Sequence, residues 1–245
     1  YADRIYQINL AIAGIAIGTV VLPQLSKYVQ NNKSEEVNLI QNKALELSLF
    51  LSVPATVGLL VASEEIVSGL FGYGTFTSED VKNSANALFY FSLGLPAFSL
   101  IKVFSSFFFA RLNTKTPFYI SLISVLINII ISVVFFNKVG FIIIPIATTI
   151  SSWFNSIILF IFLKKNNLFI FNSEFLIKFI KILIAATIMG LMFNFLLIFF
   201  TYNLSFDYNL KSLFLVSIVI LALIFYLLIA FFIKAFKISD IKLKY

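Results

Sequence analysis

Long apolar runs separated by short polar segments make up most of the chain. An α-helix needs about 20 consecutive apolar residues to cross the hydrocarbon core of a bilayer. Seven segments meet or approach this length, at residues 5–23, 47–62, 85–110, 117–136, 141–163, 175–200 and 213–236. The second segment belongs to a longer predicted helix that starts at Ser34. The pattern predicts an all-α fold, a polytopic membrane helix bundle with about seven transmembrane helices.

Composition supports a membrane environment. Hydrophobic residues make up 60% of the chain and charged residues only 12%, whereas about a quarter of the residues of a soluble domain are charged. A bilayer accepts this apolar surface as long as helices satisfy their own backbone hydrogen bonds. The chain has no histidine and no cysteine. This excludes a Ser-His-Asp triad, disulfides and thiolate metal sites within it.

The formal net charge of +7 does not indicate a nucleic-acid partner, because the cations lie at the ends of apolar runs. Cations gather after the first, third, fifth and seventh predicted helices, at Lys27, Lys33, Lys43, Arg111, Lys115, Lys164, Lys165, Lys234, Lys237, Lys242 and Lys244. Loops rich in lysine and arginine stay in the cytoplasm. We therefore expect the C-terminal Tyr245 to be cytoplasmic and Tyr1 to be external.

The predicted external segment 63–80 has no cation and contains four carboxylates, Glu64, Glu65, Glu79 and Asp80. We predict a short helix at 64–71 and a turn at 72–74, after which Thr77 or Ser78 caps the next helix. The chain begins with tyrosine rather than methionine, so we expect it to be a fragment of a longer protein.

Three charged residues near or within apolar helices are candidates for function. Arg4 follows Asp3 at the start of the first helix, and the planar guanidinium of an arginine can bind two oxygens of a pyrophosphate at once. The alternative is that Arg4 reaches the membrane interface and pairs with Asp3. Lys102 lies inside an apolar helix and is expected to face a water-filled cavity or a helix partner. Glu46 is expected on a solvated face.

Polar residues on the fourth and fifth predicted helices form a second candidate group. Asn128 and Ser132 are four residues apart and share one helix face, and Thr148 lies on the next helix. They could contribute to a cation site, but no carboxylate accompanies them. Hydrogen bonding between helices is the favoured interpretation.

Three motifs resemble one known family. The first is Tyr1-Ala2-Asp3-Arg4 followed at 14–23 by G-x-A-x-G-T-x-x-L-P, and the second is L-F-x-x-G-x-F at 70–76. The third, at 109–117, is similar to F-x-A-R-x-D-T-K-T-P, with Asn113 where aspartate is common. In this order and on this topology, they resemble the MurJ/MviN lipid II flippase family of the multidrug/oligosaccharidyl-lipid/polysaccharide (MOP) exporter superfamily. The chain departs from the family at Asn9, where proline is usual.

This resemblance implies the C-terminal lobe of a fourteen-helix MOP-type flippase. Residues 1–170 would form a C-lobe bundle of five helices, and residues 171–245 two additional helices with a short cytoplasmic tail. The additional helices would form a groove for a lipid tail. The partners would be membrane lipids and the N-terminal lobe of the same protein, which the chain lacks.

The resemblance also implies a transporter rather than an enzyme. Such a protein moves lipid II, the undecaprenyl-pyrophosphate-linked peptidoglycan precursor, to the outer leaflet of the bacterial inner membrane by alternating access. Arg4 would bind the pyrophosphate, and Asp3 and Lys102 are further candidates for substrate binding. No cofactor is expected, and transport would be coupled to the membrane potential or to a monovalent cation.

Three alternatives remain open from the sequence. One is another MOP-superfamily exporter, for polysaccharide lipids or for drugs. Another is a membrane transferase acting on polyprenyl phosphates, for which the only acidic candidates are Glu64, Glu65, Glu79 and Asp80. The last is a non-transporting scaffold in which Lys102 and Arg4 pair structurally.

Overall fold

The computed structural model describes residues 1–10 and 16–235, and within these ranges the regular structure is entirely helical. Gly14 of the first motif and the tail lysines Lys237, Lys242 and Lys244 lie outside the described residues. The first five helices are α1 (Ala2–Leu10), α2 (Ala16–Gln30), α3 (Ser34–Val61), α4 (Ser63–Phe71) and α5 (Ser78–Phe109). The remaining elements are α6 (Lys115–Val139), the 3₁₀ turn η2 (Gly140–Ile142), α7 (Ile143–Lys165), α8 (Ser173–Phe199), α9 (Thr201–Leu204) and α10 (Lys211–Phe232).

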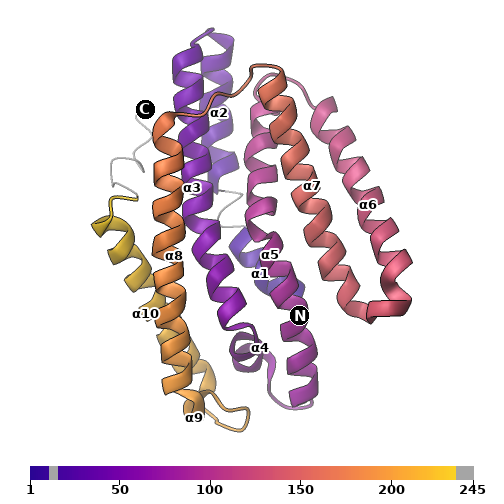
Figure 1. The fold of residues 1–245 in the computed structure, drawn as a ribbon, viewed down its shortest axis with the longest axis vertical. Helices are drawn as coiled ribbons and strands as arrows, with labels where there is room; N and C mark the ends of the chain where they lie inside the picture. The colour runs from indigo at the N-terminus through magenta and orange to yellow at the C-terminus, as the bar shows by residue number, and fades with distance from the viewer. Residues whose placement is uncertain (11–15, 236–245) are drawn as a thin grey trace.

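Five helical stretches of the described chain are long and apolar enough to cross a membrane: Ser34–Val61, Ser78–Phe109, Lys115–Lys165, Glu174–Phe199 and Lys211–Phe232. The third stretch contains two helices, because the chain reverses at Gly140 (φ 72°) and α6 and α7 form an antiparallel hairpin (Figure 1). The first predicted span, 5–23, extends over α1 and α2, and residues 11–15 between them are outside the described part. The predicted all-α membrane bundle is confirmed.

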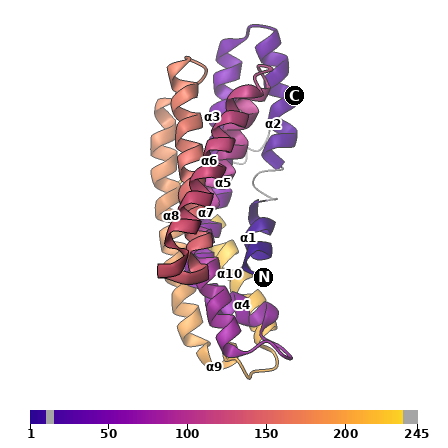
Figure 2. The ribbon, with the colours of Figure 1, turned by 90° about the vertical axis from the view of Figure 1, so that its right-hand side faces the viewer.

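Helices α3 and α5 form the centre of the bundle. Helix α8 packs on α3, α7 packs on α5, and the α6–α7 hairpin lies at one side (Figure 1). Helices α1 and α2 lie on the opposite side of α5 from α8 (Figure 2). Helix α10 packs against α8 and contacts α4.

Apolar side chains serve both the core and the surface. Phe107, Leu159 and Ile182 are among the fully buried ones. Many others on α6, α8 and α10 point outward, including Val133 at 70% exposed and Leu191 at 68%. A soluble surface rarely carries such large apolar patches, whereas lipid tails solvate them. The outward faces of α6, α8 and α10 therefore fit a lipid environment.

The N-terminus of α5 is capped by Thr77, as the sequence predicted. The Thr77 side chain accepts a hydrogen bond from the Asp80 backbone N–H, and the Asp80 carboxylate accepts one from the Thr77 backbone N–H. This reciprocal capping box satisfies N–H groups that have no partner inside the helix. The predicted cap at Thr77 and the predicted short helix, which forms α4, are both confirmed.

Candidate functional site

Arg4 and Asp3 lie on the first turn of α1, and both side chains are exposed. Asp3 accepts a hydrogen bond from the side-chain amide of Gln7, one turn later. The salt bridges of the described residues are Lys33–Glu36 and Lys178–Glu46. Arg4 therefore has no carboxylate partner within the described chain, and the predicted alternative of an Arg4–Asp3 pair is not formed.

Helix α1 packs against α5 (Figure 2) through side chains other than those of Asp3 and Arg4. Ala2 and Ile5 are buried in one apolar cluster with Leu88 and Leu95. Lys102 follows Leu95 by seven residues, which is two helical turns, so it continues the same stripe of α5. Lys102 is exposed and has no hydrogen bond or ion pair to another described residue. Arg4 on α1 and Lys102 on α5 are thus two exposed cations that have no partner among the described residues.

The predicted polar group on α6 and α7 is partly assembled. The Asn128 amide donates to the Thr148 hydroxyl (3.0 Å) and to the Ser151 hydroxyl (3.4 Å). This is a hydrogen bond between helices, as the sequence favoured. Ser132 does not join it, because its buried hydroxyl has no hydrogen-bond partner among the described residues. Without a carboxylate, these residues hold the α6–α7 hairpin together.

The prediction that Glu46 lies on a solvated face is wrong. Helix α8 covers this part of α3, and the Glu46 side chain is only 6% exposed. Its carboxylate pairs with the Lys178 ammonium of α8 at 2.7 Å. Periodicity along α3 cannot reveal this partner, which is 132 residues away in the chain.

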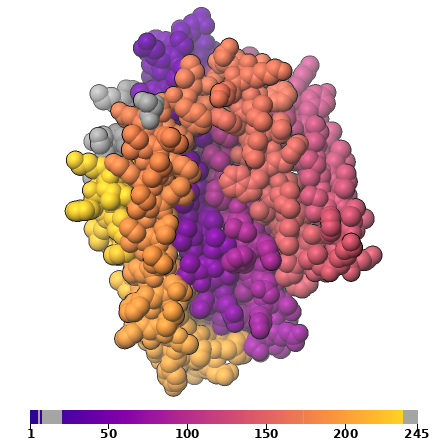
Figure 3. Space-filling model, in the orientation of Figure 1, coloured from indigo at the N-terminus to yellow at the C-terminus, as the bar shows by residue number. Residues whose placement is uncertain are grey.

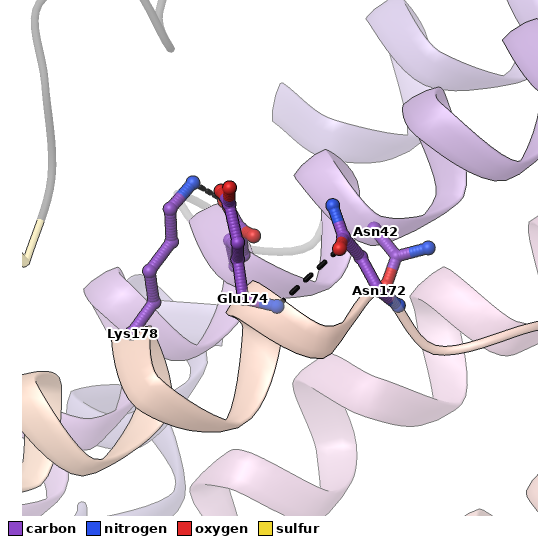
Figure 4. A network of polar contacts seen from close by, with 5 residues as sticks. Asn42, Asn172, Glu174 and Lys178 are labelled. Carbon is purple, nitrogen blue, oxygen red and sulfur yellow. Dashed lines mark hydrogen bonds and ion pairs between the residues drawn. The ribbon is translucent and has the colours of Figure 1, made fainter.

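Asn42, one turn before Glu46, anchors the connection that leads into α8 (Figure 4). Its amide donates to the Ile170 carbonyl, and its side-chain oxygen accepts from the Asn172 backbone N–H. The Asn172 side chain then accepts from the Glu174 backbone N–H and caps α8. This polar network seats the start of α8 on α3.

Arg111 of the third motif joins two connections at the same end of the bundle. Its guanidinium donates to the carbonyls of Phe107 and Leu168. Gln41 of α3 donates to the Leu168 carbonyl as well. Burial lowers the pKa of Arg111 from its ordinary value. In the described chain, this motif residue therefore holds the α7–α8 connection in place.

Lys211 is a buried cation that the sequence analysis missed. It is 2% exposed, and its ammonium donates to the carbonyls of Gly72 (2.6 Å) and Phe206 (2.5 Å). The same ammonium lies over the rings of Tyr73 and Phe206, at 4.5 and 4.4 Å from their centroids. The available signal was a lone lysine directly before an apolar run, on the side predicted to be poor in cations.

An open apolar cavity of about 530 Å³ lies between α3, α5, α7 and α8. The space-filling view shows this hollow between α8 and α7, with α3 and α5 at its floor (Figure 3). Leu49, Leu100, Phe160 and Phe175 line it, together with Trp153, whose indole N–H donates to the Leu93 carbonyl. The cavity is suited to a hydrocarbon chain rather than to a polar solute.

Comparison with known proteins decides the family. The family model "Lipid II flippase MurJ" matches residues 1–214. The chain belongs to the lipid II flippase MurJ family. Among curated relatives of this family, the probable lipid II flippase MurJ of Rickettsia prowazekii is 36% identical over 191 residues, which is 78% of this chain and 38% of that protein.

Other members of the family agree. The probable lipid II flippase MurJ of Thermotoga maritima is 36% identical over 217 residues, covering 89% of this chain and 42% of that protein. A solved structure of lipid II flippase MurJ in an inward closed conformation superposes with a TM-score of 0.76 at 29% identity. This superposition covers 96% of this chain and 46% of the solved chain. The chain thus spans less than half the length of these relatives.

The resemblance predicted from the three motifs is confirmed, and the chain is a multi-pass membrane protein. Within residues 1–10 and 16–235, no group of three or more histidine, cysteine, aspartate or glutamate side chains is placed to hold a metal ion.

Proposed function

We propose that this chain forms part of a lipid II flippase of the bacterial inner membrane, and that the whole protein moves its lipid-linked substrate between leaflets. The observation that carries this proposal is the family match over residues 1–214. The proposal makes the chain a transporter component rather than an enzyme. It favours lipid II over the substrates of other MOP-superfamily exporters and over a transferase reaction, because the curated relatives are described as lipid II flippases.

The substrate contacts that we propose are Arg4, Asp3 and Lys102. Arg4 is exposed and has no carboxylate partner among the described residues, so its guanidinium is available to a pyrophosphate. Lys102 offers a second free ammonium along the stripe of α5 that packs on α1. Asp3 holds Gln7 and leaves Arg4 unpaired.

The remaining parts of the proposal follow the family pattern. Residues 1–170 would form the lobe that faces an N-terminal lobe outside this chain, and the helices after residue 171 would be additional to that lobe. Rocking of the lobes around the pyrophosphate site would give alternating access. The lysine-rich ends would face the cytoplasm, Tyr1 would be external, and the membrane potential or a monovalent cation would drive the cycle.

The test uses the complete gene in bacteria depleted of their own lipid II flippase. Wild type is compared with Arg4→Ala, and with Lys82→Ala as a matched control, because Lys82 is an exposed cation near the start of α5. Growth and the arrival of lipid II in the outer leaflet are measured, and membrane levels of each variant are checked. We expect rescue by wild type and Lys82→Ala but not by Arg4→Ala.

Two outcomes would contradict the proposal in different ways. If a well-expressed wild type failed to rescue, lipid II would not be its substrate, and other polyprenyl-linked substrates would be tested next. If Arg4→Ala rescued as well as wild type, the flippase assignment would stand and the pyrophosphate role of Arg4 would be rejected.

A further inference from the structure

Helix α3 carries a proline within its membrane-length stretch. Pro54 lies inside the helix, between its start at Ser34 and its end at Val61. Proline has no backbone N–H, so position 54 cannot donate the hydrogen bond that the carbonyl four residues earlier normally accepts. That carbonyl belongs to Phe50. Since the hydrocarbon core of a bilayer offers no water as a substitute, another part of the protein has to supply the donor.

The donor comes from α10. The Tyr226 hydroxyl donates to the Phe50 carbonyl at 2.8 Å, across 176 residues of sequence separation. Tyr226 is 2% exposed, and its ring packs against the ring of Phe50 with the centroids 5.2 Å apart. One turn before and one turn after Tyr226, the buried face of α10 carries Ala222 and Ala230, whose small side chains leave room for the tyrosine to reach α3. The buried hydroxyl gains an acceptor, and the helix gains the donor that its proline cannot provide.

A second helix with an internal proline shows that this match is specific. In α5, Pro96 removes the helical donor for the Ser92 carbonyl. Side chains of α7 donate to carbonyls of α5 nearby, but they reach Tyr90 and Leu93. These bonds tie α5 to α7 without replacing the bond that the proline removes. In α3, by contrast, the tyrosine reaches the carbonyl whose helical donor is lost.

The parts of α3 before and after this point are fastened to different neighbours. Before it, Asn42 and Glu46 bind the start of α8. After it, α3 leads directly into α4, and carbonyls at the end of α4 accept hydrogen bonds from Lys211 and Ser212 of α10. Residues 50–54 are thus a joint between a part of α3 bound to α8 and a part bound, through α4, to α10. A helix bends most easily where a proline interrupts its hydrogen bonds.

We infer that Pro54 allows α3 to bend and that the Tyr226 hydroxyl is a latch that fixes this bend. With the bond formed, the end of α3 and α4 keep one position relative to the base formed by α8 and the start of α3. With the bond broken, the two parts of α3 move against each other at the proline. Tyr226 is therefore a positioning residue that acts through α3. This inference concerns motion within the chain and is independent of which lipid the whole protein carries.

A double-mutant cycle by chemical unfolding of the purified complete protein in detergent tests the latch. Tyr226→Phe removes only the hydroxyl, and Pro54→Ala restores an N–H that can donate to the Phe50 carbonyl within α3. We expect Tyr226→Phe to lower the equilibrium constant for folding about tenfold in the wild-type background. In the Pro54→Ala background it should change this constant by less than about twofold, because the carbonyl has its helical donor again. Tyr202→Phe is the control and should change neither, since Tyr202 of α9 is exposed.

The distance between two spin labels measures the bend itself, which a contact that only adds stability would not change. The labels are attached through Leu39→Cys, on α3 before the joint, and Leu70→Cys, on α4 after it, in a complete protein without other cysteines. Both positions are exposed. We expect one narrow distance distribution with Tyr226 present, in the Tyr202→Phe control, and in Tyr226→Phe combined with Pro54→Ala. Tyr226→Phe alone should broaden or shift it. A distribution unchanged by Tyr226→Phe, or an equal loss of stability in both backgrounds, would overturn the inference.

Discussion

Charged residues in this chain differ mainly in what compensates them. Glu46 has Lys178, and Lys211 has two carbonyls and two aromatic rings. Arg4 and Lys102 have no partner among the described residues and are exposed. A buried charge without compensation is expensive in an apolar surrounding. The compensated residues therefore hold the fold together, whereas the uncompensated exposed ones are available to a ligand.

The Glu46–Lys178 pair should be strongly coupled. Lys178→Met leaves a buried carboxylate without its partner, which should lower the free energy of unfolding by about 3–5 kcal/mol. Adding Glu46→Gln to that variant removes the buried charge and should recover most of the loss. A double-mutant cycle from chemical unfolding in detergent measures this. Additive effects of the two substitutions would show that the pair is not coupled.

Glu65 should make stability depend on pH. Its folded pKa lies above the ordinary value of 4.5, so between these two values the folded state binds more protons than the unfolded state. The stability that this proton provides is present below pH 4.5 and is lost as the pH rises through the folded pKa. In detergent solution, Glu65→Gln should therefore melt higher than wild type at pH 8 and match it below about pH 4.5. Unfolding midpoints of both proteins are recorded across this pH range. A constant difference between the two midpoints would show that the pKa of Glu65 is not raised in the folded state.

At the scale of elements, short polar contacts decide how the helices are joined. The Asn42 network seats α8 on α3, and Arg111 and Gln41 hold the connection before it. At the other end of the bundle, Lys211 and Ser212 of α10 donate to the carbonyls of Gly72 and Gly69 at the end of α4. Carbonyls at a helix C-terminus favour a cation, so the Lys211 ammonium of α10 stabilises the C-terminal end of α4.

Removing the Lys211 ammonium should loosen α10 from α4. Lys211→Met keeps the length of the side chain but loses both bonds to carbonyls. The expected loss is about 2 kcal/mol, because bonds from a charged donor are among the stronger ones. Hydrogen exchange in detergent should become faster at residues 66–74 and 206–215 and stay unchanged in the α6–α7 hairpin. Lys138→Met, an exposed lysine of that hairpin, is the control and should leave exchange in both segments unchanged.

At the scale of the whole molecule, apolar faces and charged ends orient the bundle. The outward faces of α6, α8 and α10 carry large apolar side chains, while Arg111, Lys115, Lys164 and Lys165 gather at the connections of one end. A pocket lined by Glu64 and Glu65 and the buried Lys211 both lie at the end that carries α4 and α9. By the positive-inside rule, the end with α4 and α9 should be external.

Cysteine labelling can test this orientation cleanly, because the chain contains no cysteine of its own. Thr75→Cys and Thr114→Cys place single thiols at exposed positions on opposite ends of α5. A membrane-impermeant maleimide should modify Cys at 75 in intact cells, and Cys at 114 only after the membrane is opened. The reverse pattern would invert the predicted topology, and labelling of the wild type in each condition gives the background to subtract.

The sequence alone determined the class of fold, the approximate helix boundaries and the family. Hydrophobic length and capping chemistry are local properties, so the runs of apolar residues and the Thr77 cap could be read directly from the chain. The Asp3-Arg4 motif and its neighbours identified the family because short motifs keep their order along the chain. These features do not depend on which helices become neighbours.

Only the tertiary structure decided which polar residues meet. Glu46 looked like a solvated carboxylate until α8, 132 residues later, placed Lys178 against it. Lys211 drew no prediction from the sequence, and one of its two carbonyl partners, Gly72, lies 139 residues earlier in the chain. The pocket lined by Glu64, Glu65 and Ser68 is bounded on another side by α9 and the segment after it. Contacts between distant segments depend on how whole helices pack, and no periodicity within one helix encodes its partner.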